Sequence, residues 1–165
     1  MQQLYPWSCL TASFAYCMGV REDEIHRSIG HDGSKIIASD LPPPKDRLAF
    51  HPQELVEWCL RNGTRVVHFL ANPGYALENG MEYTLWSNEE CVTRLEKVMK
   101  HYSGVLCGKM RSGKMHAVVW DCRHQLLIDP NGFHYPKDHI QVTDFFLIQY
   151  GGFSFCEICQ GRCHA

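Results

Sequence analysis

Residues 8–19 of the chain read SCLTASFAYCMG, and this stretch predicts a helix that begins beside a cysteine. Ser8 belongs to the residue types that favour the N-cap position, and Gly19 to those that end helices. Four apolar residues recur at the spacing of one helical face: Leu10, Phe14, Cys17 and Met18. We therefore expect Cys9 to lie in the first turn of a helix whose apolar face packs against the rest of the fold.

Helical patterns dominate the first half of the chain and strand patterns the second. Further helices are expected over 21–29 and 52–61, and over a segment that Ser87-Asn88-Glu89-Glu90 opens as a capping box and that ends near Gly104. Short strands are expected over 65–70, 105–110, 115–122, 125–128 and 145–151, joined by turn residues. This order predicts an α+β fold in which an N-terminal helical part packs on a C-terminal antiparallel β-sheet.

The composition is that of one soluble globular domain. The chain has 165 residues, of which 45% are hydrophobic and 21% charged. We expect the domain to span residues 1–152 and a cysteine-rich tail to span 153–165. The net charge of -2 argues against a nucleic-acid partner, which needs a basic face. No run approaches the roughly 18 apolar residues of a membrane span, so no membrane partner is expected.

The N-terminal residues and the cysteines together indicate the compartment. The opening MQQLYPWSCL has neither a basic n-region nor an apolar h-region, so it does not predict a secretory signal. Nine cysteines are an odd number, which excludes full pairing within one chain. We therefore interpret them as reduced thiols of a cytoplasmic protein, or of an effector delivered to a host cell.

Three residues form a candidate nucleophilic site. Cys9 at a helix start lies where unpaired N–H groups and the helix dipole favour the thiolate. His116 opens an expected strand, and Asp129 ends the strand that follows it. If these strands pair, Asp129 can orient the imidazole of His116 and stabilise its charged form. Each residue alone also fits a plainer interpretation: a core cysteine, a structural histidine and a turn aspartate.

Gln3 lies six residues before Cys9 and is a candidate donor to a developing oxyanion. Its side-chain amide can supply one hydrogen bond, and the backbone N–H of Cys9 can supply a second. Gln2 is a second candidate for the oxyanion donor. A terminal glutamine without a function is the alternative interpretation.

The order of these residues resembles that of the papain-like cysteine peptidase superfamily. The resemblance is closest to the bacteriocin-processing (double-glycine leader) peptidases and their stand-alone relatives. It is carried by QLYPWSCLTASFAYCMG, HPQELVEWCLRNGTRVVHF and GKMHAVVWDCRHQLLIDPNG, which together span most of residues 3–150. Those peptidases commonly have Asp-Cys-Gly where this chain has Ser8-Cys9-Leu10, and the bulkier Leu10 is expected to narrow the approach to Cys9.

The resemblance implies a cysteine peptidase or amide hydrolase that acts on a peptide or protein substrate. Cys9 would be the nucleophile, His116 the base, Asp129 the orienting acid and Gln3 the oxyanion donor. The chemistry passes through a thioester and requires no cofactor. An acyltransferase or transglutaminase-like enzyme with the same trio remains open, and so does a non-catalytic binding module on this fold.

The tail is a candidate metal site of a different kind. Cys156 and Cys159 form a C-x-x-C pair, which is half of a typical structural zinc site, and Cys163 and His164 are further candidate ligands. A reduced tail without metal is the alternative interpretation.

Overall fold

The fold combines helices with an antiparallel sheet, as the sequence predicts. The computed structural model describes residues 2–37, 46–47, 49–71, 88–150 and 153–154. The helices are α1 (Cys9–Met18), α2 (Glu22–Ile29), α3 (Pro52–Arg61) and α5 (Asn88–Met99), with a 3-10 turn over Lys137–His139. Within the described residues, no helix is long and apolar enough to cross a membrane.

One antiparallel sheet forms the centre of the molecule, with strand order β3-β8-β4-β5-β6-β7. Its strands are β3 (Thr64–Leu70), β4 (Gly104–Met110), β5 (Met115–Asp121), β6 (Leu126–Ile128), β7 (His134–Pro136) and β8 (Ile140–Tyr150). The short β9 (Phe153–Ser154) pairs with β8, so the sheet extends two residues past 152. A separate two-stranded ladder joins β1 (Ile36–Ile37) to β2 (Asp46–Arg47).

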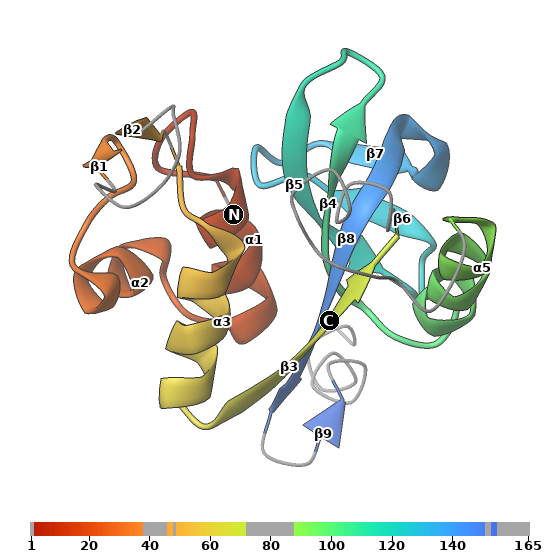
Figure 1. The fold of residues 1–165 in the computed structure, drawn as a ribbon, viewed down its shortest axis with the longest axis horizontal. Coiled ribbons are helices and arrows are strands. Elements are labelled where there is room, and N and C mark those ends of the chain that lie inside the picture. Colours follow the sequence, from red (N-terminus) through yellow and green to blue (C-terminus); the bar gives the residue numbers. More distant parts are fainter. Residues whose placement is uncertain (1, 38–45, 48, 72–87, 151–152, 155–165) are drawn as a thin grey trace.

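Two apolar cores lie on opposite faces of this sheet. Neighbouring residues of one strand, such as Val105 and Leu106, belong to different cores, and successive side chains of a strand point to opposite faces. The first core holds Phe14 and Ile25 from α1 and α2, and the second holds Leu95 from α5. Figure 1 shows α1, α2 and α3 on one side of the sheet and α5 on the other.

The helix expected to end near Gly104 ends at Met99 instead. Gly104 begins β4, where it pairs with Trp120. A Cβ at Gly104 would stand 2.4 Å from the carbonyl oxygen of Phe146. The glycine therefore permits close approach of two strands and does not terminate a helix.

The last long strand also differs from the prediction at its start. β8 begins at Ile140, five residues before the expected Phe145, and β7 before it was not predicted. A register shift between Cys107 and Gly108 of β4 divides the β4–β8 pairing. The added stretch IQVTD alternates apolar and polar residues, but the register shift falls within it, so the phase set by Ile140 and Val142 changes before Phe145 and the pattern does not run on into the expected strand.

Candidate active site

Cys9 begins α1, as the sequence predicts, and packs against the first core while remaining partly exposed. Ser8 occupies the N-cap position, but its hydroxyl does not cap the helix. That hydroxyl accepts a hydrogen bond from the Tyr5 N–H at 3.1 Å and donates one to the Tyr5 carbonyl at 3.0 Å. Ser8 therefore leaves the N-terminal end of α1 without a side-chain cap. The positive end of the helix dipole lies beside the Cys9 thiol, and such a position favours a thiolate. Leu10 is buried in the first core, so its side chain does not narrow the approach to Cys9, contrary to expectation.

His116 and Asp129 meet because β5 and β6 pair as the sequence predicts. The register joins Val119 to Ile128, so Asp129 follows β6 near the end of the sheet where β5 starts. His116 Nε2 lies 2.8 Å from Asp129 Oδ2. The second oxygen, Asp129 Oδ1, accepts the N–H of Asn131 at 2.7 Å, so both oxygens of this buried carboxylate act as acceptors.

The side chain of Cys9 also contacts His116. Burial by itself lowers the pKa of His116, but a hydrogen bond and the charge of Cys9, followed by those of Asp129, raise it to about 9. Because Nε2 faces Asp129, Nδ1 is the ring nitrogen left for the sulfur. The structure thus brings Cys9, His116 and Asp129 together in that order.

Burial disfavours the thiolate form of two other cysteines in the described part of the chain. Burial raises the pKa of Cys59 to about 12. Burial, followed by the negative charges of Asp144 and Cys9, holds the pKa of Cys107 well above its usual value. Both groups stay protonated at neutral pH, and a protonated thiol is a poor nucleophile.

Gln3 is anchored beside the trio. Its backbone N–H donates to the carbonyl of Pro130, the residue after Asp129, at 3.1 Å. Its side-chain nitrogen donates to the Tyr5 carbonyl at 2.9 Å. An amide nitrogen carries two hydrogens, so one remains for an oxyanion. Gln2 is exposed.

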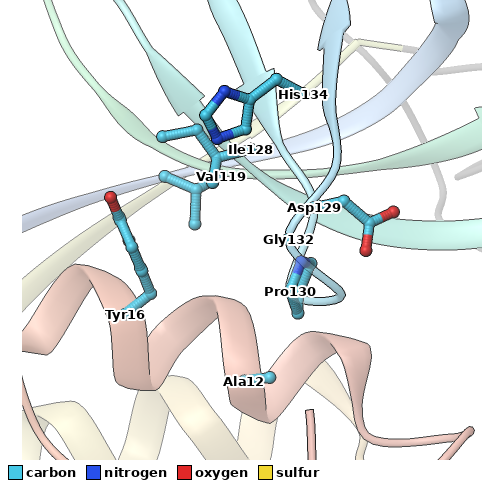
Figure 2. Close-up of a pocket in the computed structure, with 8 residues that line it drawn as sticks. All are labelled: Ala12, Tyr16, Val119, Ile128, Asp129, Pro130, Gly132 and His134. Atoms are coloured by element: carbon cyan, nitrogen blue, oxygen red, sulfur yellow. The ribbon is translucent and has the colours of Figure 1, made fainter. Parts of the chain in front are cut away.

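A pocket of about 260 Å³ borders the trio on the side of Asp129. Figure 2 shows it between α1 and the end of β6, with the Asp129 carboxylate pointing away from Tyr16 and His134. Neither Cys9 nor His116 lines it. The pocket therefore adjoins the turn that carries Asp129 and does not contain the nucleophile.

Sequence reasoning missed two polar groups on the same side of the sheet as Cys9. Glu22 is buried in the first turn of α2. Its spacing from Ile25, His26 and Ile29 places it on the same helical face, so the sequence could have indicated that it is buried. His68 and Asp144 form a second histidine–aspartate pair at 2.7 Å between β3 and β8. They are 76 positions apart, so only the strand register reveals the pair.

The proposed zinc ligands Cys156, Cys159, Cys163 and His164 lie outside the described residues. Within the described ranges, no group of three or more His, Cys, Asp or Glu side chains could hold a metal ion. Four cysteines in these ranges are free thiols: Cys9, Cys59, Cys91 and Cys107.

Comparisons with known proteins do not assign the chain to a family. No protein-family model, no curated protein and no solved structure matches it. The resemblance to papain-like peptidases therefore stays a prediction, and function must be argued from the geometry of the site.

Proposed function

We propose that this protein is a thiol hydrolase that cleaves an amide bond of a peptide or protein substrate through a thioester on Cys9. One observation carries the proposal: His116 bonds to Asp129 through Nε2 and also interacts with the side chain of Cys9. A histidine held between a carboxylate and a thiol can accept the thiol proton and later return it. This is the papain-like order of nucleophile, base and orienting acid.

The reaction has two steps. The Cys9 thiolate attacks the carbonyl carbon, and the C–S bond forms as the carbonyl oxygen becomes an oxyanion. The backbone N–H of Cys9 and the side-chain amide of Gln3 are the proposed donors to that oxygen. The oxyanion then collapses, His116 protonates the leaving amine, and a thioester remains. A water molecule, deprotonated by His116, attacks the thioester and releases the acid.

Asp129 holds the base in the productive state. Its carboxylate accepts the Nε2 proton of His116, which leaves Nδ1 free to exchange a proton with Cys9. Asp129 also stabilises the imidazolium that forms when the thiol ionises. Since Asp129 is 5% exposed, water weakens this interaction little.

Labelling of individual cysteines tests the proposal. The whole protein is treated with iodoacetamide at several pH values, and the modification of each cysteine is followed by peptide mass spectrometry. At about pH 6 we expect Cys9 to react at least ~10 times faster than Cys59 and Cys107, because only a thiolate is strongly nucleophilic. Equal rates for the three residues would show that Cys9 is a structural thiol in a non-catalytic module.

A further inference from the structure

The segment of residues 2–8, here called the strap, carries Gln3 and leads into Cys9. Two consecutive backbone amides fix it from opposite sides. The Gln3 N–H donates to the carbonyl of Pro130, and the Leu4 N–H donates to Glu22 Oε2 at 2.9 Å. Further along, the indole N–H of Trp7 donates to the carbonyl of Asp32 at 3.0 Å. The two peptide groups that flank Gln3 are therefore held between the sheet side and the helical side of the fold.

Glu22 is the partner of the strap on the helical side, and it is a buried carboxylate with 5% of its surface exposed. Its other oxygen, Oε1, lies 3.3 Å from the hydroxyl of Thr11, two residues past Cys9 in α1. The same oxygen lies 3.4 Å from His26 Nε2. One carboxylate thus contacts the strap that carries Gln3 and the helical turn that carries Cys9.

The surroundings of Glu22 hold it in this position. The His26 ring lies between Tyr5 and Phe50, at centroid distances of 5.9 and 4.9 Å, so it cannot swing away from Glu22. Burial lowers the pKa of His26, although Glu22 opposes the shift. A neutral His26 with its hydrogen on Nε2 donates toward the carboxylate and Thr11 Oγ1.

We propose that Glu22 is a positioning residue for the oxyanion site, holding the amide of Gln3 in register with the sulfur of Cys9. The inference rests on the proposed function and deepens it. Oxyanion donors act only when they sit at hydrogen-bond distance from the developing charge, and displacement by about 1 Å can cost roughly 100-fold in rate. Glu22 does not touch substrate, so it acts through the strap.

Two reagents separate this role from a general effect on Cys9. p-Nitrophenyl acetate acylates a thiolate: the C–S bond forms, an oxyanion develops, and p-nitrophenolate leaves with the electron pair of the broken C–O bond. Iodoacetamide alkylates the same sulfur by displacing iodide, and no oxyanion forms. A defect in the oxyanion site therefore slows the first reaction and spares the second.

The test variant is Glu22→Gln, and Glu24→Gln is its matched control. Gln retains the size of Glu but only one acceptor oxygen, so it cannot accept from Leu4 and from the Thr11 and His26 side simultaneously. Glu24 lies in the same helical turn and is exposed. We expect Glu22→Gln to slow acetylation of Cys9 at least about tenfold while alkylation changes less than about threefold. Glu24→Gln should alter neither rate.

Two results would overturn the inference: equal slowing of both reactions, or no slowing of acetylation. Neither is confused with failure of the proposed function, which shows as unselective alkylation of Cys9 in the unmodified protein. If Glu22→Gln does not fold, Leu4→Pro replaces it, because proline lacks the N–H that Glu22 accepts. Leu4 is 52% exposed, so the change removes the same hydrogen bond from the surface side.

Discussion

Two of the histidine–aspartate pairs in the described residues have almost equal length and differ in their surroundings. His116 and Asp129 are 2.8 Å apart at the β5–β6 end, and His68 and Asp144 are 2.7 Å apart across β3 and β8. The side chains of the first pair are 18% and 6% exposed, and those of the second 39% and 23%. Water therefore screens the second pair more strongly than the first.

A cysteine lies near each pair, in a different relation to it. Cys9 contacts His116, the member that can take up its proton. Cys107 is the register partner of Asp144 on β4, and burial together with the charge of that aspartate disfavours its thiolate. On the proposed function, a short histidine–aspartate contact does not activate a thiol by itself, because the imidazole must also contact the sulfur.

Replacing each histidine by alanine should give the largest contrast between the pairs. We expect His116→Ala to slow the alkylation of Cys9 by iodoacetamide at neutral pH about 100-fold, because the thiol loses its base. His68→Ala should leave the rate within about twofold, because His68 bonds to Asp144 on the other pair. The alkylation rate of Cys9 in each variant is measured by peptide mass spectrometry. Comparable losses in both variants would contradict the assignment of His116 as the base.

Replacing each aspartate by asparagine should also slow the reaction of Cys9 more at the first pair than at the second, but by a smaller factor than the histidine substitutions. Asp129 uses both oxygens as acceptors, one for His116 and one for the Asn131 N–H. An asparagine has one acceptor oxygen, so it either loses the turn or places its NH₂ group against Nε2 and forces the wrong tautomer. We expect Asp129→Asn to slow acetylation of Cys9 by p-nitrophenyl acetate about 10- to 100-fold. Asp144→Asn is the control, and a loss as large as that of Asp129→Asn would break the comparison.

Local pattern and strand order were enough to predict the first pair but not the second. Cys9 can be identified from the apolar periodicity that starts α1, and the β5–β6 hairpin brings together His116 and Asp129, which are only 13 positions apart. His68 and Asp144 meet through pairing of strands distant in sequence, and nothing local specifies that register. Long-range pairing therefore limits what a single sequence reveals about a site.

Local sequence patterns were also enough to predict the α+β class. They did not predict which helix covers which face of the sheet. The order of helices and strands indicates the class, but α5 covers the face of the sheet opposite α1. The amphipathic pattern of a helix identifies its buried side and does not say which sheet face receives it. The anchoring of Gln3 was hidden likewise, because it depends on Pro130 and on the buried Glu22.

The smallest expected effect is a change in the pKa of His116, which distinguishes the two pairs because His116 is the histidine that contacts Cys9. Its pKa of about 9 exceeds the ordinary value of 6.5, with Cys9 supplying the largest raising contributions. Cys9→Ser replaces an ionisable thiol by a hydroxyl that does not ionise, so the pKa of His116 should fall, as followed by NMR titration of its ring protons. The spectrum of His68 should not respond to this substitution.

The raised pKa of His116 also sets how the free energy of unfolding changes with pH. Because the folded pKa of His116 lies above the unfolded one, proton binding contributes stability that is complete below about pH 6.5 and is lost as the pH rises through about 9. Urea unfolding should thus show the native protein losing more stability than Cys9→Ser between these two pH values. An unchanged His116 titration in Cys9→Ser would mean that sulfur and imidazole do not interact, and the two histidine–aspartate pairs would then differ only in their exposure to water.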